Sequence, residues 1–178
     1  GGICGWIGGI TSHYATLVNA YSRGTIALSS NSAAICGGTT AYCTLSGCYY
    51  LHSSAAGGIG YNVNAYVTQS KSGEQFASGE VAYLLGGAFG QTLGTDAFPV
   101  FRVSNGSNEV YKLTYMNEAT LHATQFYNEG NEVSAAGVAE PTKNGRTFSH
   151  WEGLPDAMPA SDVTVSAVFT ILTEVSLL

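Results

Sequence analysis

Hydrophobic and polar positions alternate with a period of two in the C-terminal part of the chain. The alternation is clearest in three runs, at residues 110–115, 121–126 and 163–169. Successive side chains on a strand point to opposite faces, so each run predicts a half-buried β-strand. The first two runs are joined through Asn117 and Glu118 and are expected to pair. Residues 141–151 predict a turn at Gly145 followed by a further strand.

The N-terminal part instead repeats short apolar runs bounded by glycine. The run Gly-Ile-Cys-Gly at residues 2–5 is echoed by Ala-Ile-Cys-Gly at 34–37, an offset of 32 residues. The run Asn-Ala-Tyr at 19–21 is echoed by Gly-Cys-Tyr at 47–49, an offset of 28, and a third, weaker start follows at 57–61. Glycine permits sharp corners, and a single short rung cannot bury its own apolar face. The pattern therefore predicts a stack of parallel β-rungs.

Equivalent residues of successive rungs are expected to form ladders through this stack. Ile3 should lie over Ile35 and then over Ile59, and Cys4 should lie over Cys36. A stack of two or three rungs exposes apolar surface at both ends, so it needs a cap at each end.

A short helix is expected at about residues 78–86. Ser78 is a suitable N-cap, Glu80 favours the positive end of the helix dipole, and the glycines at 86 and 87 stop the helix. We expect this segment to close the stack by covering the apolar end and the open strand edge of the last rung.

The distribution of charge marks a boundary in the same region. Residues 1–73 contain no Asp or Glu and carry only Arg23 and Lys71, whereas all 12 acidic residues lie further on, so the two parts carry +2 and −8 and sum to −6. The run Ser-Asn-Gly-Ser at 104–107 reads as a linker, an interpretation we prefer to N-glycosylation at Asn105. The predicted domains are residues 1–104, residues 109–172 and a tail at 173–178.

Both parts resemble known families of bacterial surface proteins. The run GGICGWIGGITS at 1–12, with the landmarks at 19–21 and 47–51, resembles the GLUG-type repeat, and SGEVAYLL followed by GQTLGTDAFPV is similar to the segment that closes solenoids of such repeats. The runs PTKNGRTFSHW at 141–151 and MPASDVTVSAVF at 158–169 resemble the Listeria–Bacteroides repeat, also called the internalin-type B repeat, over about residues 110–170. Arg146 departs from that pattern, which usually has Tyr or Phe there.

These resemblances imply an all-β chain. Its first part would be a short right-handed parallel β-helix or solenoid with a capping helix, and its second part a small β-grasp-like (ubiquitin-like) module used in tandem as a surface spacer or interaction module. We expect Trp151 and Phe148 to anchor the core of the second module, because aromatic side chains bury large areas. We interpret the chain as a fragment of a larger exported protein at the extracellular bacterial cell surface.

The composition argues against two classes of binding partner. Only 10% of residues are charged and the net charge is −6, so the chain lacks the basic face that nucleic acids and anionic membranes require. No run approaches the roughly 18 apolar residues of a membrane span. We expect no nucleic-acid partner, no membrane insertion and a monomer as a fragment.

The four cysteines are the main candidates for chemistry. Their even number allows two disulfides, in three connectivities, or buried free thiols: Cys4, Cys36, Cys43 and Cys48. Zinc bound by the last three with His52 would need spacings looser than structural sites usually have. A cysteine nucleophile with His13 or His52 is opposed by burial, which raises a thiol pKa. Solenoid hydrolases and lyases need paired carboxylates, and residues 1–73 contain no Asp or Glu. We therefore expect no catalytic residue. We also expect no metal ligand and no cofactor.

Aromatic residues give the one indication of binding. The candidate ligand contacts are Trp6, Tyr42, Tyr49, Tyr50 and Tyr61. The alternative is that they fill the core or an ordinary strand surface, since Tyr is enriched in strands. The chain is expected to be a non-catalytic scaffold, spacer or adhesion module of a secreted cell-surface protein, with an unknown protein or glycan partner. The alternative is a carbohydrate-binding accessory module of a larger extracellular glycan-active protein, which an exposed aromatic strip would favour.

Overall fold

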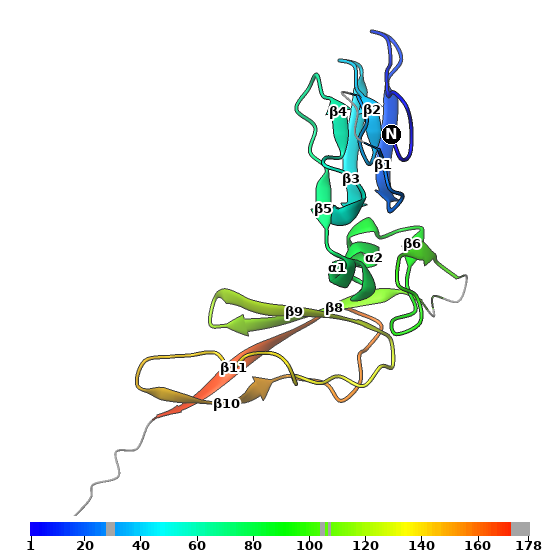
Figure 1. Ribbon diagram of the computed structural model, residues 1–178. Coiled ribbons are helices and arrows are strands. Elements are labelled where there is room, and N and C mark those ends of the chain that lie inside the picture. Colours follow the sequence, from blue (N-terminus) through cyan, green and yellow to red (C-terminus); the bar gives the residue numbers. More distant parts are fainter. Residues whose placement is uncertain (28–30, 104–105, 107, 172–178) are drawn as a thin grey trace, which may run out of the picture.

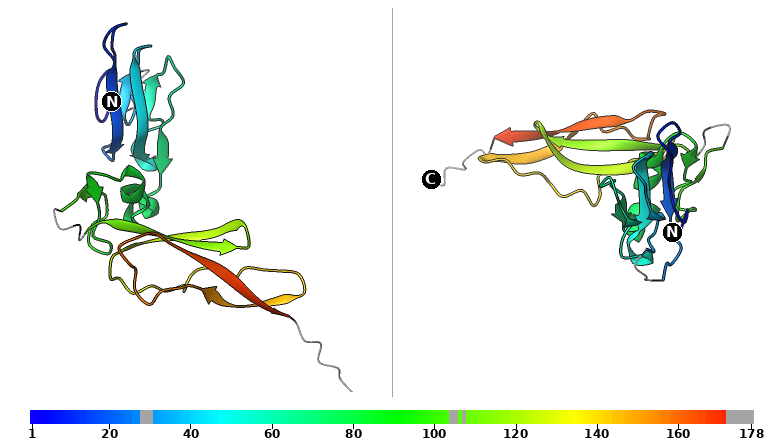
Figure 2. Two further views of the ribbon diagram at one scale, coloured as in Figure 1. Left: turned by 180° about the vertical axis from the view of Figure 1, so that it is seen from behind. Right: turned by 90° about the horizontal axis from the view of Figure 1, so that it is seen from above.

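The computed structural model describes residues 1–27, 31–103, 106 and 108–171. Strands dominate and the helices are short, so the chain is broadly all-β. It has two elongated arms set at an angle: the first arm (residues 1–71) and the second arm (residues 108–171), which meet at a joint (residues 72–103) that holds both α-helices (Figures 1 and 2). Within the described residues, no helix has the length and apolar character needed to cross a membrane.

The first arm is made of two parallel sheets. Its strands are β1 (Ala15–Ser22), β2 (Cys36–Gly38), β3 (Cys43–Leu51), β4 (Ile59–Tyr61) and β5 (Gln69–Lys71), with a 3₁₀ turn η1 (His52–Ser54). One sheet has the order β1-β3-β5, and the other pairs β2 with β4. Isolated parallel bridges from Cys4 to Cys36 and from Ile7 to Thr39 bring the N-terminal segment alongside β2.

The register of these strands has the offsets of the sequence repeat. Ala20 lies opposite Cys48, an offset of 28 residues, and Cys4 lies opposite Cys36, an offset of 32. The expected stacking of Cys4 on Cys36 is therefore confirmed. The expected ladder from Ile35 to Ile59 is wrong by one residue, because Ile59 lies opposite Cys36. The glycine-rich start of β4 lacks a bulky side chain that would specify the register, and backbone hydrogen bonds from Ile35 and Cys36 to the Gly58 carbonyl determine it instead.

A bend at equivalent positions divides β1 and β3. Asn19 and Gly47 both have left-handed backbone conformations, with φ of 49° and 59°. Such a residue interrupts the alternation of a strand, so the inward-facing positions of β3 change phase from Cys43 and Leu45 to Cys48. The repeat therefore preserves a local backbone geometry as well as side chains.

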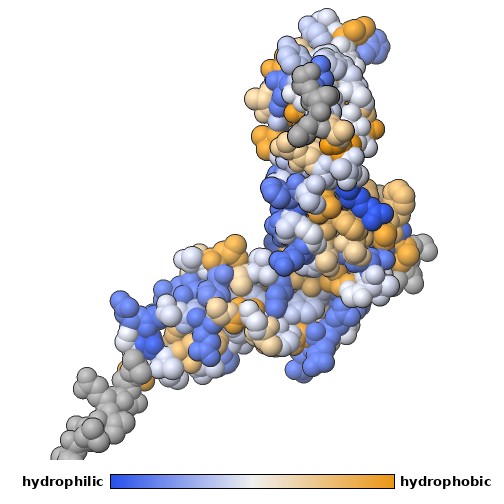
Figure 3. Space-filling model, in the orientation of Figure 1, coloured by the Kyte–Doolittle hydropathy of each residue, from blue (hydrophilic) through white to orange (hydrophobic). Residues whose placement is uncertain are grey.

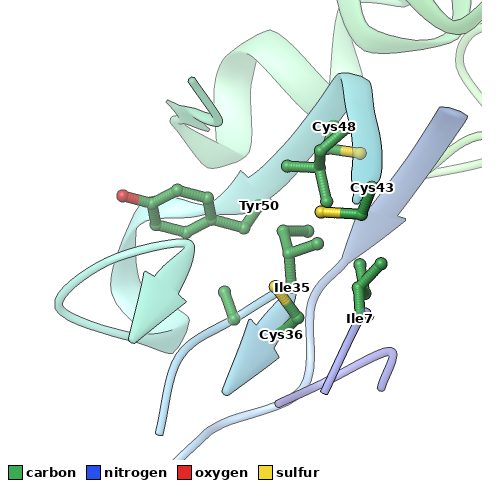
Figure 4. Close-up of a cluster of buried hydrophobic side chains, with 8 residues drawn as sticks. Ile7, Ile35, Cys36, Cys43, Cys48 and Tyr50 are labelled. Carbon is green, nitrogen blue, oxygen red and sulfur yellow. The ribbon is translucent and has the colours of Figure 1, made fainter. Parts of the chain in front are cut away.

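Apolar side chains from both sheets fill the space between them. Ile35 and Cys36 are fully buried, and Cys43 and Cys48 reach the same cluster from β3 (Figure 4). Smaller side chains of β1, including Ala20, line one side of it. This cluster is the core of the first arm, and glycine and alanine let the two sheets approach closely around it.

The joint holds two short helices, α1 (Gly73–Ala77) and α2 (Glu80–Leu85). The helix predicted at about 78–86 corresponds to α2, and α1 was not predicted. Ser72 caps α1 in a capping box, accepting from the Gln75 amide while the Gln75 side chain accepts from the Ser72 amide. The prediction that Ser78 is an N-cap is wrong: Ser78 ends α1, and Gly79, at φ 88°, precedes α2. The left-handed glycine separates α2 from α1. The positions of Glu80 in the first turn of α2 and of Gly86 at its end are confirmed.

The helices pack at the carboxyl ends of β1 and β3 (Figure 1). Phe76, Val81 and Leu85 surround Tyr49 of β3, and Tyr21 of β1 packs against the same cluster. The helices thus contact β1 and β3, and Glu80 of α2 also forms an ion pair with Lys71 of β5. A small hairpin of β6 (Phe89–Gly90) and β7 (Val100–Phe101) completes the joint.

The second arm is one mixed sheet. Its strands are β8 (Val110–Asn117), β9 (Thr120–Asn128), β10 (Arg146–Glu152) and β11 (Val163–Ile171), in the order β10-β11-β8-β9. The predicted pairing of the first two strands is confirmed as an antiparallel hairpin, and β11 runs parallel to β8. Trp151 is buried among Leu113, Tyr115 and Met158, with Phe148 packed beside it. Both predicted anchors therefore lie in the core.

The predicted linker at 104–107 lies largely outside the described residues, as do Asn105 and the predicted tail at 173–178. The residues on either side of it are well held. Asn108 is buried, its side-chain amide donates to the Phe101 carbonyl, and its side-chain oxygen accepts from the Val103 amide.

Candidate functional site

Trp6 and Tyr61 form a stacked pair on the outside of the first arm. Their ring centroids are 6.0 Å apart with an interplanar angle of 21°, and the two residues are 53% and 56% exposed. Gly38 lies opposite Tyr61 in the β2–β4 pair. A Cβ atom at Gly38 would come within 2.3 Å of the Trp6 ring, so the indole packs directly on this glycine. Glycine at this position lets the two rings form one flat, accessible surface.

The loop that follows Tyr61 is held by hydrogen bonds of two asparagines. The Asn62 side chain donates to the Tyr66 carbonyl (2.7 Å) and accepts from the Tyr66 amide (3.0 Å). Asn64 donates to the Ala41 carbonyl and to the Tyr66 hydroxyl, and that hydroxyl in turn donates to the Cys43 carbonyl. The aromatic surface formed by Trp6 and Tyr61 is thus bordered by a loop fixed to the arm, and such a surface suits a flat ligand with an apolar face.

Tyr42 belongs to a different aromatic pair. It meets Tyr14 edge-on, with centroids 6.0 Å apart. Tyr14 is 65% exposed, whereas Tyr42 is half-buried. Tyr42 therefore contributes to a second exposed aromatic position, in which Tyr14 is the more accessible partner.

Tyr49 and Tyr50 cannot serve as the predicted ligand contacts because both are buried. Tyr49 is 6% exposed and packs in the cluster of the joint, and Tyr50 is 9% exposed and belongs to the core of the first arm. The bend at Gly47 sets their orientation, so that Tyr50 points between the sheets and Tyr49 toward the helices. Of the five predicted aromatics, only Trp6 and Tyr61 are brought together at the surface.

The four cysteines are free thiols, and all except the half-buried Cys4 are buried. Burial raises the pKa of Cys36 to about 11, and it also raises the pKa values of Cys4 and Cys48. A raised pKa keeps a thiol protonated and weakens it as a nucleophile. Across the described part of the chain, no group of three or more His, Cys, Asp or Glu side chains is arranged to hold a metal ion.

The joint contains a buried polar network that the sequence analysis missed. Asn128, at the end of β9, is 5% exposed. Its amide donates to the carbonyls of Gln91 and Glu109, and its oxygen accepts from the Leu93 amide, each at 2.8 Å. Gln91 is fully buried and donates to the carbonyls of Phe76, Ala77 and Asp96. One asparagine of the second arm thus connects directly to the polar centre of the joint.

A second contact connects the joint to the residue just before β11. The Tyr83 hydroxyl of α2 donates to the Asp162 carboxylate at 2.6 Å, and the same carboxylate accepts from the Lys112 amide. This hydrogen bond raises the pKa of the Tyr83 hydroxyl, because it is made to an anion. Arg102 and Glu109 form an ion pair at 2.6 Å between the joint and the start of β8. The joint and the second arm are therefore held together at more than one point.

A groove of about 600 Å³ lies where the first arm meets the joint. Its apolar lining comes from both units and includes Ile3, Tyr21, Phe89, Val100 and Phe101. Phe101 is 78% exposed and stacks on Phe89. Figure 3 shows hydrophobic residues gathered over this part of the molecule.

Comparison with known proteins gives no match, so the proposed function depends on the geometry of the molecule. No family model matches the chain, and no curated protein matches its sequence. The resemblances to the GLUG-type and Listeria–Bacteroides repeats therefore stay predictions.

Proposed function

We propose that the chain is a non-catalytic fragment of a secreted bacterial cell-surface protein that serves as a scaffold or spacer, with an adhesion or interaction role toward a surface protein or a glycan. The absence of Asp and Glu from residues 1–73 supports this proposal, because it removes the paired carboxylates of solenoid hydrolases and lyases. The buried Cys36 supports it further, because burial raises the pKa of its thiol to about 11 and weakens it as a nucleophile.

The finer fold is part of the same proposal. In it, the first arm is a short right-handed parallel β-solenoid of the GLUG type, and the second arm is a β-grasp-like Listeria–Bacteroides repeat. The parallel pairings at offsets of 28 and 32 residues support the first assignment. The mixed sheet, with β8 and β11 as a parallel central pair flanked by antiparallel β9 and β10, supports the second.

The observation that carries the spacer role is the hydrogen-bonded joint. A flexible tether between two modules needs only an exposed, polar segment. This joint instead buries Asn128, Gln91 and Asn108, whose side chains hydrogen-bond to backbone groups of the joint and of the second arm. The first arm contributes Tyr49 and Tyr21, which pack against the helices of the joint. Buried polar groups with specific partners favour one arrangement over many, because any other arrangement leaves them unpaired. A spacer of fixed angle follows from this contact.

Accessibility on intact cells tests the location that the proposal requires. An antibody raised against the chain should label intact cells of the producing bacterium, and an external protease should remove that label. An antibody to a cytoplasmic protein is the matched control and should label only lysed cells. Labelling of this chain only after lysis would contradict the proposal.

The stacked pair of Trp6 and Tyr61 supports a second candidate function, a carbohydrate-binding accessory module. Exposed aromatic rings can stack on the apolar faces of sugar rings, and this pair is held by the Gly38 backbone beneath it. A glycan array probed with the whole chain tests this candidate. Trp6→Ala and Tyr61→Ala should each abolish binding, whereas Tyr14→Ala, at an exposed aromatic of another pair, should retain it. No binding by the folded chain would exclude this candidate for the glycans on the array.

A further inference from the structure

Cys4 and Cys36 differ from the other cysteines in their backbone relation. They lie directly opposite each other in a parallel bridge between the N-terminal segment and β2. Neighbouring strands lie about 4.8 Å apart, and disulfides join Cα atoms that are about 4.4–6.8 Å apart. Cys43 and Cys48 instead share strand β3. Five residues of strand span roughly 16 Å, far more than a disulfide can bridge.

A disulfide from Cys36 to Cys43 or Cys48 is less favourable than one from Cys36 to Cys4. Cys43 and Cys48 reach the core from β3, and the Ile35 side chain projects between them and Cys36 (Figure 4). The electrostatic effects agree with this arrangement. Burial is the main reason that the pKa of Cys36 is raised, and Cys4 has the largest effect among the other thiols.

We propose that Cys4 and Cys36 are a dithiol that a small oxidised thiol compound, such as glutathione disulfide, converts into a disulfide joining the first two rungs. The half-buried Cys4 is the more accessible of the two, so its thiolate attacks one sulfur of glutathione disulfide and releases one glutathione thiolate. The Cys36 thiolate then attacks the Cys4 sulfur of this mixed disulfide and releases the second glutathione. The two protein thiols lose two electrons and two protons, and glutathione disulfide gains them as two molecules of glutathione.

The cross-link would act on the aromatic surface of Trp6 and Tyr61. Cys4 lies two residues before Trp6, and Cys36 lies two residues before Gly38, on which the indole packs. Joining the two cysteines would therefore restrain Trp6 against Gly38. An extracellular location would supply the oxidising conditions, but the chemistry itself does not depend on that location.

Peptide mapping of the oxidised full chain tests the proposal. The chain is incubated with glutathione disulfide at about pH 8.5, near the ordinary pKa of a thiol, then denatured, alkylated with iodoacetamide and digested. Trypsin cuts after Arg23 and Lys71, so it separates a peptide with Cys4 from a peptide with the other three cysteines. Chymotrypsin cuts after Tyr42 and separates Cys36 from Cys43 and Cys48.

The expected result is a cross-link between the fragments that carry Cys4 and Cys36, with alkylation at the other two cysteines. Cys4→Ser and Cys36→Ser should each abolish the cross-link, and Cys43→Ser, the matched buried control, should retain it. Three outcomes with the wild-type chain would overturn the proposal: four alkylated cysteines, a cross-link from Cys4 to the fragment that carries Cys43 and Cys48, or glutathione left on Cys4. None of these outcomes bears on whether the chain lies at the cell surface.

Discussion

Replacing Asn128 by alanine should weaken the joint more than any exposed substitution in the second arm. The side chain makes three hydrogen bonds of 2.8 Å, to the Gln91 and Glu109 carbonyls and from the Leu93 amide. Alanine removes all three and leaves those backbone groups without their partner at a position that is 5% exposed. Each lost hydrogen bond of this kind costs about 1 kcal/mol, so we expect the free energy of unfolding to fall by about 3 kcal/mol.

Chemical denaturation followed by tryptophan fluorescence measures this loss. The two tryptophans lie in different arms, Trp6 in the first and Trp151 in the second. In wild type a coupled joint should give both signals one midpoint, and Asn128→Ala should lower the midpoint and separate the two signals. Asn144→Ala, in an exposed turn, is the control and should change stability by less than about 0.5 kcal/mol. A loss below about 0.5 kcal/mol for Asn128→Ala would refute the role assigned to this network.

Three further predictions address the aromatic surface, the second core and the buried thiol. Gly38→Ala places a Cβ atom 2.3 Å from the Trp6 ring, so it should displace the indole and shift Trp6 fluorescence to the red; an unchanged spectrum would contradict the packing. Trp151→Ala, at a residue 8% exposed and 4.9 Å from the Tyr115 ring centroid, should cost about 3–5 kcal/mol of unfolding free energy in denaturant titrations. Because folding raises the pKa of Cys36 from 9.0 to about 11, its contribution to stability is complete below pH 9 and is lost as pH rises toward 11. Melting temperatures should therefore fall over that range in wild type and fall less in Cys36→Ala.

Features that depend on local sequence were predictable. The hairpin of β8 and β9 and the strand β11 follow from a period of two, and the offset that pairs Ala20 with Cys48 follows from the repeat itself. In each case the pattern can be recognised within short runs of the sequence. The same local patterns indicated Trp151 and Phe148 as core residues.

Features that depend on one backbone angle or on distant contacts were not predictable. The left-handed Gly47 changes which residues of β3 face inward, so that Tyr50 lies in the core of the first arm and Tyr49 is buried against the helices. A period of two read across that glycine assigns the wrong face. Gly79, at φ 88°, likewise precedes α2 in the place of the predicted N-cap Ser78.

The joint is the extreme case of dependence on distant contacts. Asn128 ends a strand and precedes a turn, a place where asparagine is usually exposed. Its side-chain partners lie 19, 35 and 37 residues away in the chain. Nothing in the neighbouring sequence distinguishes it from an exposed asparagine such as Asn144. Gln91 lies in the segment that the sequence analysis singled out, but its burial depends on the packing of α1.

Small-angle X-ray scattering of the wild-type chain and Asn128→Ala tests the central claim, a spacer with a fixed angle between its arms. We expect wild type to scatter as one monomeric two-armed shape, fitted by a single arrangement of the arms, and the variant to require a spread of arrangements. A wild-type profile that already requires the same spread as the variant would contradict a fixed joint.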